Sequence, residues 1–358
     1  MKKALMRLIA IMLIAVLSFS LAACHKPGEL AVTVGGEEFS SGFYACAFLA
    51  ADNEAQSRVY EEAEKNGETV NVGNYLNKTI DGVLYPQWVK KRAIEICQQI
   101  VAAKKLCEQN NVSTADYLES AKNNAKTDWQ TNREYFEKNG IGVESYQKFC
   151  AYEQYATAYF DYLYGKDGPS EVTDDVRNKF IKENYCVINA IDVDVTKMTE
   201  KQLEDQEKEF NGFIDRVKKG ESFGKIYAEA TGATYTEKDD VTDGKGFSFT
   251  SGMIWGAKGT SYESLLFDDV KDMEAGTFKI IKNNTAVEGY TYMILAYKGD
   301  IFDKKNPNIE TIKTVALDDM KGDEFDKLLV EESKKITATE NTKSTKQFKA
   351  EKIYYPEG

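Results

Sequence analysis

The first 24 residues constrain this chain most, because they have the pattern of a cleaved export signal. Lys2, Lys3 and Arg7 give a basic start, and an apolar run over residues 8–19 follows. That run is too short to span a bilayer comfortably, and small residues end it at Leu21-Ala22-Ala23. The pattern predicts that residues 1–23 are a signal peptide and that the mature protein folds outside the cytoplasm.

Cys24 directly follows Leu-Ala-Ala, and this ending resembles the bacterial lipobox, in which the thiol is acylated before cleavage. The resemblance implies lipidation of Cys24 and a lipoprotein anchored to the bacterial cell membrane. An ordinary secretory signal with an incidental cysteine is the alternative. No second long apolar segment is present in the sequence, so we expect the membrane to be a partner only through the anchor.

The charge and the histidine content exclude several classes of function. A net charge of −12 argues against binding to nucleic acid or to anionic lipid surfaces. The single histidine, His25, adjoins the anchor, so a Ser-His-Asp triad or Cys-His pair has no base to use. The usual histidine-containing zinc sites are excluded for the same reason, and Gly244-x-Gly246 lacks the frame of a nucleotide fingerprint. We therefore expect no metal and no cofactor.

Five cysteines remain beyond Cys24, which is an odd number without a C-x-x-C pair. Cys97 and Cys107 fall on one predicted helix about 15 Å apart, whereas a disulfide tolerates about 7 Å between Cα atoms. Small buried thiols are the favoured role for the set, although the sequence leaves its redox state open. The set is Cys46, Cys97, Cys107, Cys150 and Cys186.

The first half of the chain is predicted to be mainly helical after a strand at residues 30–34. An aromatic helix is expected over about residues 143–164, with two adjacent stripes on its surface. One stripe is Tyr146, Phe149, Ala156, Phe160 and Leu163, and the other is Tyr152, Tyr155, Tyr159 and Tyr162. The second stripe is either packed inside the protein or a contact surface for unfolded clients, since tyrosine offers large area with few torsions to freeze.

The pattern changes near residue 185. Residues 186–195 alternate like a strand, and Thr199-x-x-Gln202 predicts a capped helix. Shorter β-rich segments are expected at 277–281 and 290–297, a final helix at about 309–336, and a strand-like end at 348–355.

The order of the helical elements resembles the N-terminal chaperone domain of PrsA-like and SurA-like foldases. The motifs that carry the resemblance are Val32-Thr-Val-Gly-Gly-Glu-Glu-Phe-Ser40, Ala102-Ala-Lys-Lys-Leu106, Gly140-Ile-Gly-Val-Glu-Ser-Tyr146 and Val172-Thr-Asp-Asp175. The resemblance implies an α+β protein with a mostly helical chaperone domain and an inserted second domain. The expected boundaries are 24–182 for the first helical part, 183–303 for the insert, and 304–358 for a helix and strand that return to the helical domain.

The insert is similar to a parvulin-type rotamase domain, an antiparallel sheet with flanking helices. The similarity lies in Val217-Lys-Lys-Gly220-Glu-Ser-Phe223, Tyr262-Glu-Ser-Leu-Leu-Phe267, Met273-Glu-Ala-Gly276 and Gly289-Tyr-Thr-Tyr-Met-Ile294. It implies that Asp192 and Thr291 occupy the positions of the two cleft histidines and that Tyr262 is the aromatic residue of the proline pocket. Because both imidazoles are missing, we expect weak or absent isomerase activity.

These observations predict a membrane-anchored folding chaperone whose partners are unfolded or partly folded exported proteins. The candidate client contacts are Tyr152, Tyr155, Tyr159 and Tyr162. Two alternatives stay open: an active peptidyl-prolyl isomerase with an altered, histidine-free cleft, and a solute-capturing lipoprotein of a transporter. The clients and the oligomeric state cannot be read from the sequence.

Overall fold

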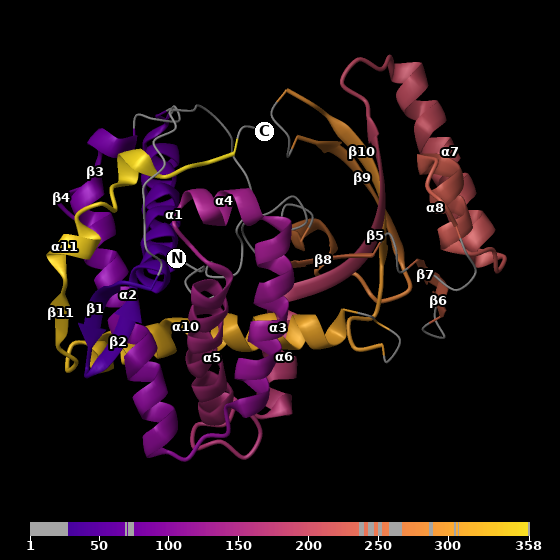
Figure 1. The fold of residues 1–358 in the computed structure, drawn as a ribbon. Coiled ribbons are helices and arrows are strands. Elements are labelled where there is room, and N and C mark those ends of the chain that lie inside the picture. The colour runs from indigo at the N-terminus through magenta and orange to yellow at the C-terminus, as the bar shows by residue number, and fades with distance from the viewer. Residues whose placement is uncertain are drawn as a thin grey trace. The chain divides into compact units, whose positions relative to one another are not determined.

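The structure is a computed structural model of the 358-residue chain (Figure 1). It describes residues 28–68, 70, 75–235, 240–242, 247–249, 253–257, 267–285, 289–303, 306 and 308–356, and it describes only the backbone of 240–242, 247–249, 253–257 and 283. The chain divides into two compact units. The first ends at Glu171 and resumes at Asp319, and the second runs from Val172 to Asp318.

The first unit is helical with a small sheet. Its elements are β1 (Leu30–Val34), β2 (Glu37–Ser40), α1 (Ser41–Asn66), η2 (Tyr75–Asn77), β3 (Thr79–Ile80), β4 (Val83–Leu84), α2 (Tyr85–Gln109), α3 (Ala115–Thr131), α4 (Arg133–Lys138), α5 (Val143–Tyr164), the end of helix α10 (whole helix Ile309–Ser333), β11 (Ala338–Glu340), α11 (Thr342–Thr345) and η5 (Ala350–Lys352). In the sheet, β1 lies between β11 and β2, and both pairings are antiparallel. The last segment of the chain therefore pairs with the first described strand.

Helix α1 shows how local sequence sets the elements of this unit. Ser40 caps its start by accepting a hydrogen bond from the backbone amide of Phe43 at 3.3 Å. Gly67 ends it with a φ of 66°, a conformation that glycine adopts without steric cost. Small buried side chains such as Ala47, Ala51 and Ala55 let α2 and α5 approach closely, which builds one continuous core.

The second unit is an antiparallel sheet with helices. Its elements are α6 (Asp174–Asn184), β5 (Tyr185–Asp194), α7 (Glu200–Lys218), α8 (Phe223–Thr231), β6 (Asp240–Thr242), β7 (Phe247–Phe249), β8 (Met253–Ala257), β9 (Phe278–Asn284), β10 (Tyr292–Lys298) and the start of α10 (Ile309–Ser333). The order in the sheet is β8-β5-β10-β9, with every pairing antiparallel. Helices α7 and α8 lie along one face, as Figure 1 shows. The α+β class predicted from the sequence is confirmed.

Two helices belong to the second unit because they pack against β5. Ile181 of α6 and Ile312 of α10 are fully buried in one cluster with Tyr185 and Val187 of β5. Both helix segments therefore belong to the unit that contains the sheet, and α10 continues from there into the helical unit.

Some local predictions agree with the structure and others do not. The aromatic helix has the predicted bounds, and Thr199 and Gln202 form the predicted capping box. The strand predicted at 348–355 is wrong: residues 350–352 form a 3₁₀ turn, and the C-terminal strand is β11, which forms because residues 338–340 pair with β1.

Candidate functional site

The two predicted cleft positions lie at two neighbouring strands of the sheet, one within β5 and the other directly before β10. Asp192 is near the end of β5, and Thr291 directly precedes β10. The register sets Asp192 opposite Ile294 and Asp194 opposite Tyr292. Thr291 lies one step further, where its carbonyl oxygen accepts a hydrogen bond from the amide of Val195 at 2.7 Å.

This register separates the two positions onto opposite faces. Opposed residues of an antiparallel pair point to the same side of the sheet. Val195, the partner of Thr291, is buried in the core beneath α7 and α8. Asp192 lies two residues after Ala190 and therefore on the same face of β5. Ala190 packs in the cluster on the face opposite to Val195. The structure therefore does not bring the side chains of Asp192 and Thr291 together, and Tyr292 is the residue that shares the face of Asp192.

Near the end of β5, the face that carries Asp192 is acidic and aromatic. Asp192 and Asp194 are exposed, and the ring of Tyr292 stacks on Tyr290 with centroids 6.2 Å apart. Burial, and then the nearby carboxylates of Asp194 and Asp192, raise the pKa of the Tyr292 phenol. Hydrated carboxylates keep water near this face, whereas rotation about X-Pro is favoured by withdrawing water from the amide.

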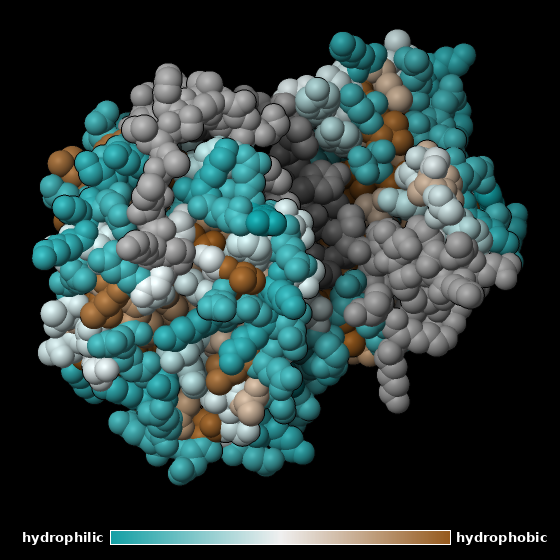
Figure 2. Space-filling model, in the orientation of Figure 1, coloured by the Kyte–Doolittle hydropathy of each residue, from teal (hydrophilic) through white to brown (hydrophobic). Residues whose placement is uncertain are grey.

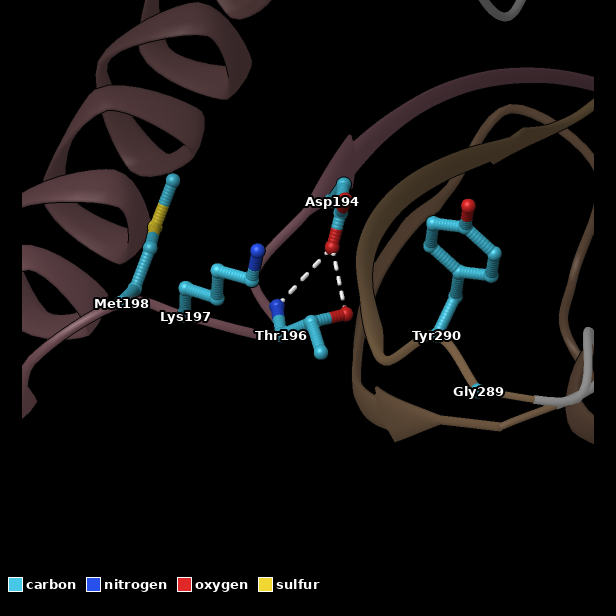
Figure 3. Close-up of a pocket in the computed structure, with 6 residues that line it drawn as sticks. All are labelled: Asp194, Thr196, Lys197, Met198, Gly289 and Tyr290. Carbon is cyan, nitrogen blue, oxygen red and sulfur yellow. Dashed lines mark hydrogen bonds between the residues drawn. The ribbon is translucent and has the colours of Figure 1, made fainter.

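A shallow pocket of about 380 Å³ lies at this end of the sheet (Figure 3). The turn after β5 contributes Asp194, Thr196, Lys197 and Met198, and the segment before β10 contributes Gly289 and Tyr290. Asp194 accepts hydrogen bonds from the amide of Thr196 at 2.9 Å and from its hydroxyl at 2.6 Å, which lowers the pKa of the carboxyl group. The hydroxyl of Thr196 in turn accepts a bond from the amide of Thr291 at 2.8 Å. These bonds fasten the two turns to each other.

Two predicted site residues, Cys24 and Tyr262, lie outside the described part of the chain. Within the described part, no group of three potential metal ligands is found. In the same residues no helix combines the length and hydrophobicity needed to cross a membrane. Cys46, Cys97, Cys107 and Cys150 are free thiols. Of the five cysteines, Cys46, Cys97, Cys107 and Cys186 are buried and Cys150 is half-buried.

The tyrosine stripe of the helical unit runs along α5, which begins after Gly142 and ends at Gly165. A Cβ on Gly165 would lie 2.3 Å from the carbonyl oxygen of Asp161, so only glycine fits this exit. Tyr152, Tyr155 and Tyr162 are half-buried, whereas Tyr159 is only 7% exposed. Figure 2 shows small hydrophobic patches within a largely hydrophilic surface on the visible face of the molecule.

Packing on both sides of the stripe holds its rings in place. Tyr152 meets the rings of Phe39 and Phe43 edge-on, each at 5.9 Å. Fully buried Phe325 of α10 packs on Tyr159 at 6.3 Å, and burying a phenylalanine contributes about 1.5–3 kcal/mol. Tyr155 and Tyr162 contact these anchored rings at 5.6 and 5.7 Å. Both are half-buried, so part of each ring is available to a partner.

A second feature of the helical unit is a cavity of about 470 Å³ between α1, α3, α4 and α5. Its walls are mainly apolar and include Leu49, Ala50, Ala125 and Phe149. Glu153 of α5 also lines it, and desolvation raises the pKa of this carboxyl group from 4.5 to about 8. An acid in such a place can hold or release a proton near neutral pH.

Similarity to known proteins is confined to solved structures. No protein-family model and no curated protein matches the sequence. Similar structures include the foldase protein PrsA from Lactococcus lactis, at 12% identity over 89% of this chain and 97% of that one, with a TM-score of 0.37. PrsA from Streptococcus pneumoniae matches at 12% identity over 72% and 92% with a TM-score of 0.35, and PrsA from Bacillus subtilis at 18% over 69% and 84% with 0.28. The chain is thus similar to PrsA proteins.

Sequence reasoning missed Tyr292 and Glu153. Both faces of β10 are apolar from residue 293 to 297, so alternation alone could not fix which neighbour of Thr291 shares a face with Asp192. Glu153 lies four residues after Phe149, within the first aromatic stripe of α5. A carboxylate within that stripe was the available indication.

Proposed function

We propose that this protein is a folding chaperone for exported proteins, anchored to the cell membrane through lipidated Cys24. The observation that carries the proposal is the tyrosine stripe of α5, in which anchored Tyr152 and Tyr159 support half-buried Tyr155 and Tyr162. Rigid, amphipathic rings bind many apolar segments weakly, which a chaperone needs because its clients must leave in order to fold. The motifs that resemble the PrsA and SurA chaperone domains support the same proposal.

Replacing Tyr155 and Tyr162 together by serine should abolish most of the holdase activity. Each ring contributes an estimated 0.5–1.5 kcal/mol, so we expect about tenfold weaker client binding. The measurement is light scattering of a denatured model protein at near-stoichiometric chaperone. Tyr60→Ser on α1 is a matched control and should keep full activity. Unchanged suppression by the folded double variant would contradict the role of the stripe, and a wild-type protein that suppresses nothing would favour a solute receptor.

The sheet unit is proposed to be a weak or inactive isomerase. Rotation about X-Pro takes roughly tens of seconds without a catalyst and needs no proton transfer. Its catalysis depends on a cleft that withdraws water from the amide. We expect the mature full-length chain to leave the exchange rate of a proline peptide unchanged. Robust turnover that Asp192→Ala or Tyr262→Ala removes would establish the alternative, an active isomerase with a histidine-free cleft.

A further inference from the structure

The cavity of the helical unit opens beside α3. This helix packs along α5 and buries a single side chain of its own, Ala125. Exposed Ser120 and Asn124 line the cavity from α3, and half-buried Asn53 and Gln154 line it from α1 and α5. The cavity therefore has an apolar interior and a rim of hydroxyl and carboxamide groups that can bond a peptide main chain.

Glu153 is the unpaired charge of this cavity. Among the residues that the structure describes, none donates a hydrogen bond to its carboxylate, and no lysine or arginine lines the cavity. The other carboxylate in the lining, Asp128, already accepts bonds from Tyr146 and Asn132. The remaining titratable groups that line it are Cys46 from α1, Tyr117 from α3, Tyr135 from α4, and Tyr146 and Cys150 from α5.

A carboxylate against apolar walls is costly unless a cation meets it. The complementary ligand has a positive charge on an apolar stem, and its stem can lie against Leu49, Ala50 and Phe149. A net charge of −12 favours the approach of such a group. The rim favours a side chain carried on a peptide over a free amine, because a free amine leaves the rim groups without partners.

We propose that this cavity binds a lysine or arginine side chain of an unfolded client segment, with the cation paired to Glu153 and apolar neighbours at the mouth. The inference rests on the chaperone function proposed above and adds a preference for basic residues in an apolar context. The charged pair forms only with ionised Glu153, so binding should be coupled to loss of a proton. Because the pKa of the empty site is about 8, affinity should rise about tenfold per pH unit up to pH 8 and then level off.

The test is fluorescence anisotropy of the full mature chain with a labelled leucine-rich peptide that has one central lysine. The comparison peptide has norleucine in its place, which keeps the stem and removes the charge. At pH 8 we expect the lysine peptide to bind about tenfold tighter, as a charge-assisted hydrogen bond warrants. Glu153→Gln should remove this difference, whereas Glu144→Gln, an exposed position of the same helix, should keep it.

The remaining arms separate the possible failures. Ala121→Phe, which narrows the cavity from α3, should weaken both peptides, and thermal melts of all variants establish that they are folded. Equal binding of the two peptides to the wild type, or an unchanged lysine preference in folded Glu153→Gln, would overturn the inference. The inference would also be overturned if hexylamine bound in a Glu153-dependent way and the lysine peptide did not bind. A wild-type protein without holdase activity would instead count against the proposed function.

Discussion

Asp52→Ala is expected to destabilise the helical unit by about 3–5 kcal/mol, because it removes the carboxylate that three hydrogen bonds share as their acceptor. Asp52 is 1% exposed on α1 and accepts hydrogen bonds from Tyr85 at 2.9 Å, Gln56 at 2.7 Å and Tyr355 at 2.5 Å. Burial raises the pKa of its carboxyl group although these bonds oppose the shift. Urea unfolding followed by circular dichroism gives the free energy of unfolding.

Two companion variants make this result specific. Glu62→Ala removes an exposed carboxylate from the same helix and should change stability by less than about 0.5 kcal/mol. Tyr355→Phe removes one donor of the network and should cost about 1–2 kcal/mol. If Asp52→Ala were as stable as Glu62→Ala, the network would be held together by packing and not by its carboxylate.

Glu153→Gln is expected to stabilise the protein at alkaline pH by roughly 2–3 kcal/mol, at about 1.4 kcal/mol per unit of pKa shift less an allowance for solvent in the cavity. The unfolded chain ionises this carboxyl group near its ordinary pKa of 4.5, and the folded chain holds the proton until about pH 8. The folded state therefore binds more protons in this range, and stability falls as pH rises from 4.5 to 8. A neutral glutamine removes that loss.

The measurement is the free energy of unfolding of both proteins at pH 4.5, 6, 7, 8 and 9. The gap between variant and wild type should be small at pH 4.5, widen up to pH 8 and stay constant above it. Glu144→Gln should show no such widening. A gap that is the same at every pH would mean that the folded protein does not hold the proton of Glu153.

The elements that the sequence predicted well are those that local chemistry decides. The bounds of α5 follow from Gly142 and Gly165, and the start of α7 from a capping box that needs only Thr199 and Gln202. Strand pairing between segments that are distant in sequence has no such local sequence signal. The strand β11 at residues 338–340 exists because β1 offers it an edge about 300 residues earlier, and its polar sequence did not indicate a strand.

In the candidate site, too, local sequence predicted some features and long-range packing decided others. The helical stripe placed Tyr152, Tyr155, Tyr159 and Tyr162 along one helix, but their exposure depends on Phe325, which arrives from α10. β5 could be predicted from alternation and β10 from its β-rich composition, whereas the register that places Asp192 and Thr291 on opposite faces could not. Burial of a charged group such as Asp52 depends on Tyr85 and Tyr355, neither of which is its neighbour in sequence.

The helical unit is assembled from both ends of the chain, and this has a consequence for biogenesis. A ribosome or an export channel releases the polypeptide from its N-terminus, so β11 and Tyr355 emerge after residues 172–318. Residues 172–318 are continuous and can reach their native topology while the rest is still being threaded. The helical unit must wait for residues 338–355, so a nascent copy would stay incomplete until these residues are released.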